Sequence, residues 1–317
     1  MKKILPICCI FICLFFTACK KQDTGETGGY LFAHMLTSDY GRLYYSISRD
    51  GRNWELLHDS LRVDSLYRGH PDICQGADGA YYMIGAEKSP ARPVLWKSKD
   101  LVSWKVERKL PVSLFLDNHT GHTANSAWYG APKLFFDEAS DHFMITWHAP
   151  KNGVARGDDW WRSMRTFYTL TRDFEKFTEP ERLFYFRGSD KNMATIDAVI
   201  RKAGTGYYAI IKDERWPQDT PVGKTIRMAS SASLTGPYSD PGVPVTPSWH
   251  EAPTVVPRIG GKGWNMYVES YPERYVLYTA DSLNGSWSAV ETNLEGVRHG
   301  CVLRINEQQY KTLKTRF

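Results

Sequence analysis

The feature that most constrains the fold is a repeat of three kinds of short segment, each found five times along the chain. One kind is an alternating strand followed by a polar turn and an aromatic residue, which is typical of an outer β-hairpin. It occurs at residues 43–57, 94–107, 166–180, 226–240 and 275–290. The second kind predicts middle strands at 29–36, 79–86, 142–149, 206–214 and 264–271. The third kind is more apolar and predicts inner strands at 70–76, 130–137, 196–202, 251–258 and 298–305. A repeat of this kind indicates an array of similar β-sheets.

These segments predict an all-β fold, a five-bladed β-propeller with four strands in each blade. The chain opens on a middle strand, 29–36, and its last inner strand, 298–305, has no middle strand after it. A ring resolves both ends, because the two strands then share one blade and no sheet edge is left open. A β-sandwich is the alternative, but it gives no reason for five cycles. No helical periodicity is evident after residue 19.

The first residues have the pattern of a bacterial lipoprotein signal. Lys2 and Lys3 give a basic start, and the apolar run that follows is too short for a comfortable membrane span. The small residues Thr17 and Ala18 stand directly before Cys19. The sequence therefore predicts cleavage before Cys19 and attachment of lipid to its sulfur.

This pattern divides the chain into three expected parts: a signal peptide at 1–18, a tether at 19–29 and a single propeller domain at 30–317. We expect the membrane to be a partner through the lipid on Cys19, at the bacterial cell envelope, on the outer membrane or the periplasmic face. A true membrane helix is the alternative, but charged residues follow Cys19 immediately.

Charge and cysteine content exclude several classes of protein. The formal charge of +5 comes from Lys and Arg scattered among acidic residues, which argues against a nucleic-acid partner. Only Cys74 and Cys301 follow Cys19, so we expect neither a disulfide framework nor a cysteine metal site. Aromatic residues make up 14% of the chain, which suits both β-strands and surfaces that stack on sugars.

Candidate catalytic residues stand at the starts of the predicted inner strands, which converge on one end of the axis of a propeller. These starts carry His70 and Asp72, Asp197, Glu251 and His299. Acids on separate inner strands can face one another across a pocket. That arrangement serves glycoside hydrolysis, in which one acid protonates the leaving oxygen and another carboxylate activates water.

The chain resembles glycoside hydrolase family 43 over almost its whole length after the signal. Four segments carry the resemblance: 128–149, 195–214, 249–271 and 298–305. Members of that family are five-bladed propellers that cleave arabinofuranosides, xylosides or galactosides with inversion. The resemblance implies that Glu251 is the general acid and that Asp197 orients it and tunes its pKa. It also implies that His299 lies beneath the pocket and helps hold a hydrated cation such as calcium, although no cofactor is expected to be required.

The predicted general acid has a consistent physical rationale. An acid on an inner strand, shielded by aromatic residues and close to a second carboxylate, has its pKa raised toward neutrality. We therefore expect Glu251 to carry a proton at working pH. The alternative for both Glu251 and Asp197 is an ordinary acid at the entry of a strand.

The base is the point where the sequence departs from the family. The family pattern Arg-Asp-Pro-x-Ile reads Gly-His-Pro-Asp-Ile here, so His70 takes the place of the acid. Asp72 lies two residues on, and residues i and i+2 of a strand point to the same face. Three hypotheses follow: Asp72 is the base, His70 is the base and Asp72 orients it, or the base is lost.

Tryptophans in loops or just before inner strands are candidates for stacking on a sugar ring; they are Trp128, Trp160, Trp216 and Trp249. The alternative is that they pack between blades. The sequence thus predicts an inverting, exo-acting glycosidase that removes arabinofuranose, xylose or a related sugar from an oligo- or polysaccharide. A non-catalytic glycan-binding propeller and a propeller for protein assembly are the rival classes.

Overall fold

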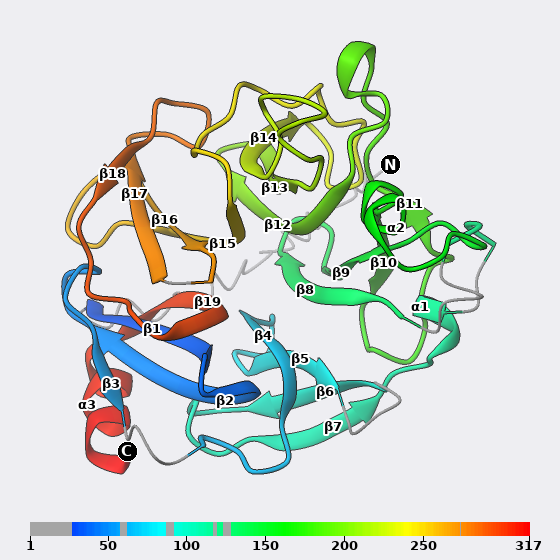
Figure 1. Ribbon diagram of the computed structural model, residues 1–317. Helices are drawn as coiled ribbons and strands as arrows, with labels where there is room; N and C mark the ends of the chain where they lie inside the picture. The colour runs from blue at the N-terminus through cyan, green and yellow to red at the C-terminus, as the bar shows by residue number, and fades with distance from the viewer. Residues whose placement is uncertain (1–26, 58–61, 87–91, 117–118, 123–127, 273) are drawn as a thin grey trace, which may run out of the picture.

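Five antiparallel sheets stand around a common centre and confirm the all-β, five-bladed propeller (Figure 1). The computed structural model describes residues 27–57, 62–86, 92–116, 119–122, 128–272 and 274–317. The predicted signal and most of the tether, residues 1–26, lie outside this part. Within the described residues no helix has the length and apolar character needed to cross a membrane.

Within each blade the strands run from the inner to the outer edge in the following order. Blade 1 contains β19 (Val297–Asn306), β1 (Thr27–Leu36), β2 (Asp39–Ser48) and β3 (Glu55–Leu57). Blade 2 contains β4 (Arg68–Gln75), β5 (Tyr81–Ala86), β6 (Pro93–Ser98) and β7 (Lys105–Lys109). Blade 3 contains β8 (Gly130–Asp137), β9 (His142–Ala149), β10 (Arg165–Thr171) and β11 (Glu181–Arg182). Blade 4 contains β12 (Thr195–Ala203), β13 (Gly206–Asp213) and β14 (Thr225–Ser231). Blade 5 contains β15 (His250–Pro257), β16 (Trp264–Ser270), β17 (Arg274–Ala280) and β18 (Ser288–Val290).

The two ends of the described chain close the ring, as the sequence predicts. β19 pairs antiparallel with β1, with Leu303 opposite Leu31 and Cys301 opposite Ala33. β1 begins at Thr27, so the last three residues of the expected tether, 27–29, belong to this sheet. Blade 1 therefore has the same four-stranded order as blades 2, 3 and 5, with β19 at its inner edge and β3 at its outer edge.

Blade 4 differs from the prediction, because its sheet has three strands in the described chain rather than four. Residues 239–245 run along β14 but donate only three backbone hydrogen bonds to it, from Ser239, Gly242 and Val245. Pro241 and Pro244 fall between these residues and have no N–H to donate. The backbone N–H groups that bond to β14 therefore come from every third residue, whereas in a regular antiparallel strand they come from every second residue.

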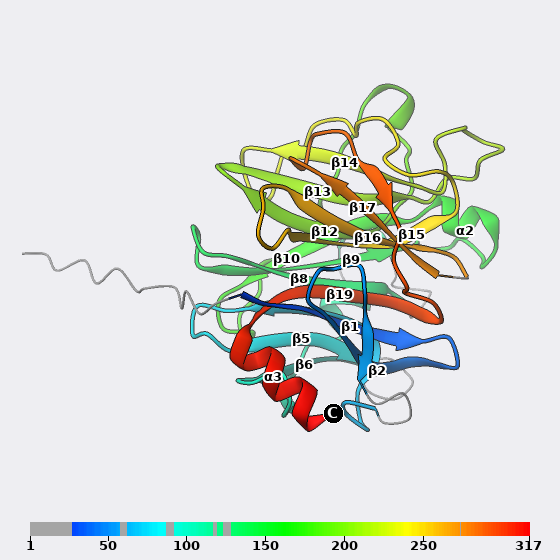
Figure 2. The same ribbon diagram turned by 90° about the vertical axis from the view of Figure 1, so that its left-hand side faces the viewer.

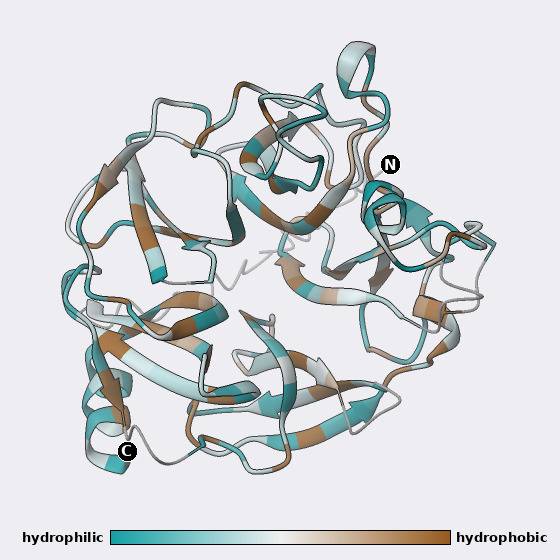
Figure 3. Cartoon of the chain, viewed as in Figure 1, coloured by the Kyte–Doolittle hydropathy of each residue, from teal (hydrophilic) through white to brown (hydrophobic). Residues whose placement is uncertain are grey.

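The core consists of one hydrophobic cluster at each of the five interfaces between neighbouring blades. At the interface that closes the ring, Tyr30 and Phe32 of β1 pack with Tyr267 and Tyr275 of blade 5. Residues of the middle strands β1, β5, β9, β13 and β16 are mostly buried, and Figure 3 shows hydrophobic residues interspersed with hydrophilic ones along the strands. Cys74 and Cys301 are free thiols on the adjacent inner strands β4 and β19.

Helices are few, but one corrects the expectation that the chain has none. α1 (Ser113–Leu116) and α2 (Asp158–Arg162) are single turns, whereas α3 (Glu307–Arg316) runs against blade 1 on the outside of the ring (Figure 2). α3 begins at a capping box: the Asn306 side chain accepts the Gln309 N–H, and the Gln309 side chain accepts the Asn306 N–H. Tyr310 and Leu313 are buried in the cluster between blades 1 and 2.

A shift of register near the start of the inner strands shapes the centre of the ring. It occurs between Gly130 and Lys133 in β8, between Ile196 and Val199 in β12 and between Glu251 and Thr254 in β15. The residue after the first of each pair has a positive φ: 30° at Ala131, 50° at Asp197 and 48° at Ala252. These bulges turn the inner-strand starts toward the axis.

Candidate active site

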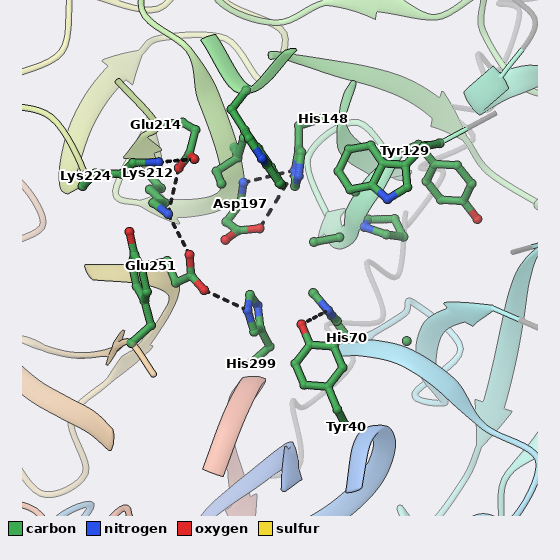
Figure 4. A pocket seen from close by; sticks show the side chains of 18 of the residues that line it. Tyr40, His70, Tyr129, His148, Asp197, Lys212, Glu214, Lys224, Glu251 and His299 are labelled. Atoms are coloured by element: carbon green, nitrogen blue, oxygen red, sulfur yellow. Dashed lines mark hydrogen bonds and ion pairs between the residues drawn. The ribbon is translucent and has the colours of Figure 1, made fainter. Parts of the chain in front are cut away.

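A cavity of about 640 Å³ opens at the centre of the ring, at the end where the inner strands begin (Figure 4). Seven of the residues that the sequence singled out line it: His70, Trp128, Asp197, Trp216, Trp249, Glu251 and His299. The prediction that inner-strand starts from different blades converge on one pocket is therefore confirmed. Their chemical roles are not tested by this arrangement.

The cavity also has walls at the ends of the middle strands, and of these residues His148 was not singled out from the sequence. Because inner and middle strands are antiparallel, the start of one lies opposite the end of the other. Gly130 faces His148 and Ile196 faces Lys212, both of which line the cavity, whereas Glu269, opposite Glu251, does not. Polar residues end three of the predicted middle strands, so the sequence held an indication of this part of the cavity wall.

Gly130 shows why a small residue is needed in that pairing. A Cβ placed on Gly130 would lie 2.0 Å from Nε2 of His148, so only glycine admits the imidazole at this point. His148 is buried, and burial lowers its pKa to about 4, although the neighbouring Asp197 carboxylate opposes this effect. A neutral imidazole thus forms part of the cavity wall beside Asp197.

Glu251 lies at the centre of a chain of charged side chains. Its Oε2 accepts a hydrogen bond from Nζ of Lys212 at 2.7 Å, and its Oε1 is 3.2 Å from Nε2 of His299. Lys212 also forms a 2.8 Å ion pair with Glu214, which in turn contacts Lys224. Figure 4 shows this chain running along one side of the cavity.

The electrostatics of Glu251 are opposite to the expectation from the sequence. Burial alone would raise the pKa of its carboxyl group, but Lys212 and His299 outweigh burial and hold that pKa well below its usual range. For His299, burial is likewise outweighed by Glu251 and Glu269, so its pKa is raised. Between the two groups, the proton therefore resides on the imidazole of His299 and Glu251 is a carboxylate in this arrangement.

Asp197 links two inner strands beside Glu251. Its side chain is buried, and its Oδ2 accepts the backbone N–H of Ala252 at 3.2 Å. Its Oδ1 lies 3.9 Å from Nδ1 of His148. Since Ala252 follows Glu251 directly, the contact fixes the backbone that carries Glu251, as expected of an orienting residue.

His70 lines the cavity on the opposite side. Its Nε2 is 2.9 Å from the hydroxyl of Tyr40, and its ring lies 4.1 Å, centroid to centroid, from the ring of His299. Burial, helped by His299 and Lys133, holds the pKa of His70 well below its usual range. The imidazole is therefore neutral in this arrangement.

Asp72 does not line the cavity, and this position counts against the hypothesis that it acts as the base. Its side chain is 2% exposed, and its Oδ2 accepts the backbone N–H of Leu134 at 2.6 Å. The i, i+2 argument fails because β4 is irregular here: the three residues between Arg68 and Asp72 lie opposite the single residue between Ala86 and Ile84. Asp72 therefore joins blade 2 to blade 3, and no contact between Asp72 and His70 supports an orienting role.

Trp160 also differs from its predicted role. It is 3% exposed and packs with Met164 and Ile196, while its neighbour Trp161 lines the cavity. Both lie in α2, where consecutive residues point in different directions. Trp160 supports the rings of Trp128 and Trp161 from behind.

The residues around His299 do not fit the cation that the family resemblance implied. Glu251, Glu269 and His299 offer ligand atoms within 4.8 Å of one another. However, Lys212 already pairs with Glu251 and Arg298 with Glu269, so the carboxylates have no uncompensated charge for a metal ion.

The fold and the cavity define a class, that of glycoside hydrolases built on a five-bladed propeller. Residues 26–311 match a family related to glycoside hydrolase family 43 and described as "Probable glycosyl hydrolase domain". The chain belongs to this family.

Comparisons with individual proteins agree with the class. An α-L-arabinofuranosidase from Bifidobacterium longum subsp. longum is 24% identical over 245 residues, which are 72% of this chain but only 19% of that enzyme. An α-L-arabinofuranosidase from Fusarium graminearum superposes with a TM-score of 0.54 at 13% identity, covering 83% of this chain and 80% of the other. An exo-β-1,3-galactanase from Clostridium thermocellum gives 0.52 at 15% identity, covering 71% and 48%. At these identities the structures support the fold alone.

Proposed function

We propose that the protein removes a terminal sugar from a glycan by inverting hydrolysis in the central cavity. One observation carries the proposal: Glu251 of β15, Asp197 of β12 and His70 of β4 converge from three inner strands on one cavity. Inverting glycosidases need a proton donor and a base on opposite sides of the anomeric carbon, with room for water between them. Glu251 and His70 stand on different sides of the cavity and supply this pair (Figure 4).

In the proposed reaction, water attacks the anomeric carbon while His70 takes one of its protons, and the glycosidic oxygen leaves with a proton from Glu251. That proton comes from the pair of Glu251 and His299, which share the 3.2 Å contact between Oε1 and Nε2. Binding of a sugar excludes water from the pair, which favours the neutral form of both partners and moves the proton to Glu251. Asp197 holds Glu251 in place.

The proposed substrate is a terminal arabinofuranose, xylose or related sugar. The name of the Bifidobacterium relative, an α-L-arabinofuranosidase, supports this choice. Two aromatic walls suit the apolar face of a sugar ring. Trp128 and Trp161 form one wall, and Trp216, Trp249 and Tyr271 form the other.

A non-catalytic glycan-binding propeller is the second candidate. The observation that favours it is the absence of a carboxylate at the base position, where His70 stands and from which Asp72 is turned away. A screen of aryl glycosides with arabinofuranosyl, xylosyl and galactosyl groups separates the two candidates. We expect turnover of one of them, and proton NMR should show the inverted anomer of the released sugar first. Glycan binding without turnover of any member of the panel would favour the second candidate.

A pair of substitutions in β4 tests the base directly. His70→Ala is expected to lower kcat at least about 100-fold, because the water then lacks a general base. Asp72→Asn should leave kcat within about threefold, because its amide oxygen still accepts the Leu134 N–H and the side chain never meets the sugar. Steady-state kinetics together with melting curves would separate catalysis from folding. Loss of activity in Asp72→Asn, together with wild-type activity in His70→Ala, would instead assign the general base to Asp72.

We also propose that the mature protein starts at Cys19 and is held at the cell envelope by lipid on that residue. The support is the sequence pattern alone, since Cys19 lies outside the described residues. Mass spectrometry of the mature N-terminus, with Cys19→Ser as the control, would detect the acyl chains. A wild-type N-terminus without lipid would contradict the proposal.

A further inference from the structure

Lys133 is a buried charge that the proposed reaction does not use. Its side chain is 3% exposed, and its Nζ makes no hydrogen bond to any described residue. Burial of an ammonium group without a partner is costly, so such a group is expected to serve the charge balance of its surroundings.

The position of Lys133 in β8 explains why it has no partner. Asp72 of β4 and Thr254 of β15 each lie directly after the bulge of their own strands, as Lys133 does. Their oxygens accept the backbone N–H groups of Leu134 and Val302 on the next inner strand, at 2.6 and 2.9 Å. Lysine has only donors, so it cannot form this bond.

The ammonium group instead acts on residues from several blades. Its charge lowers the pKa of His70 on β4 and of His148 on β9, and it opposes the effect of burial on Asp72 and Cys301. A charge felt on β4, β9 and β19 together lies near the axis of the ring. Lys133 follows Gly130 of the cavity wall by three residues, so this place is deeper than the cavity itself.

Below the cavity, cationic side chains outnumber carboxylates. Arg201 adds a second cation that acts on Asp72 and on both thiols, whereas Asp72 is the only carboxylate in this set and burial raises its pKa. Nearer the cavity, Glu251 and Glu269 are paired with Lys212 and Arg298. The carboxylates of the one candidate cation cluster among the described residues, Glu251 and Glu269, are thus already compensated by cationic side chains.

We propose that the ammonium group of Lys133 supplies the central positive charge of this propeller, so that the ring binds no calcium and the enzyme needs none. Lys133 acts through its charge, which lies buried between the inner strands, without a hydrogen-bond partner in the described part of the chain, and compensates Asp72. The proposal departs from the family resemblance and does not depend on which sugar is cleaved.

Calcium itself is the first probe, with the wild-type protein and no substrate. Calorimetric titration with calcium chloride should show no binding, and the melting temperature should change by less than about 1 °C between EDTA and millimolar calcium. Saturable binding, or a loss of more than about 5 °C in EDTA that calcium restores, would overturn the proposal. Because neither readout uses hydrolysis, the outcome stands even if the glycoside screen fails.

Chemical rescue then tests the charge of Lys133. Lys133→Ala should melt several degrees below the wild type, and ethylammonium chloride should restore part of that loss, whereas ethanol and sodium chloride should not. Lys133→Arg is the matched control, and it should melt near the wild type without a response to ethylammonium. Equal responses to ethylammonium and ethanol would show that only the volume of the side chain matters, which would also overturn the proposal. If the Ala variant does not fold, Lys133→Met is titrated in the same way against Lys133→Arg, and a neutral variant as stable as the charged one counts against the proposal.

Discussion

Replacing Glu251 by glutamine is expected to lower kcat/KM at least about 100-fold on a glycoside with a poor leaving group, such as an alkyl glycoside. The same variant should lose much less activity on a dinitrophenyl glycoside, because that leaving oxygen departs without a proton. Glutamine keeps the size of the side chain and one acceptor for Lys212, so folding should be preserved. Steady-state rates on the two substrates, with melting curves for both proteins, would make the comparison.

Two controls make this result specific to proton donation. Glu269→Gln changes a carboxylate that helps to raise the pKa of His299 but does not line the cavity. At pH values below the alkaline limb the ratio of the two rates should therefore stay near that of the wild type, while the limb itself moves to lower pH. In the wild type, the pair of Glu251 and His299 loses its proton as pH rises through the raised pKa of His299. Activity on the alkyl glycoside should therefore fall on the alkaline side, and this limb should be weak with the dinitrophenyl glycoside. Equal losses on both substrates in Glu251→Gln would remove Glu251 as the proton donor.

The fold could be predicted from the sequence because its information is repeated. Five cycles of inner, middle and outer segments leave few arrangements, and the unpaired ends at 29–36 and 298–305 fix the closure of the ring. Local departures from the repeat could not be predicted this way. Pro241 and Pro244 remove the fourth strand of blade 4, and the capping box of Asn306 and Gln309 starts a helix that lies outside the repeat.

The candidate site was predicted in its position but not in its electrostatics. The inner-strand starts carry Asp197, Glu251 and His299 into the cavity, as the repeat implies. The charge state of Glu251, however, depends on Lys212, which lies 39 residues earlier in the chain and on the next blade. Position along a strand gave no indication of that contact.

The failure at Asp72 has a different physical cause. Alternation of side chains holds only while a strand keeps its register, and β4 gains two residues relative to β5 just before Asp72. The other inner strands shift in the same region, so the bulge belongs to the way this ring builds its cavity. A reading of the sequence that places the bulge first would assign His70 to the cavity and Asp72 to the blade interface.

Deletion of residues 296–317 is expected to abolish the cooperative folding of the propeller. β19 forms the inner strand of blade 1, and its Val297, Cys301, Val302 and Ile305 are buried in the two interfaces on either side of that blade. Burial of such side chains stabilises a protein by about 1.5–3 kcal/mol each, so their sum approaches the whole stability of about 5–15 kcal/mol that a domain has. The deletion would also leave the backbone of β1 unpaired at the centre of the ring.

The matched control removes only the helix and keeps the closing strand. A chain that ends at Asn306 loses Tyr310 and Leu313 from one interface but retains every pair between β19 and β1. It should still unfold cooperatively, at a lower temperature than the full chain, whereas the longer deletion should give no melting transition and expose apolar surface to a hydrophobic dye. The two expected results have one cause. Loss of the closing strand β19 opens both interfaces of blade 1 at once, whereas loss of the helix weakens only one of them. A cooperative transition near the wild-type temperature after deletion of 296–317 would show that β19 is dispensable, and the closed ring would then be the wrong account of this fold.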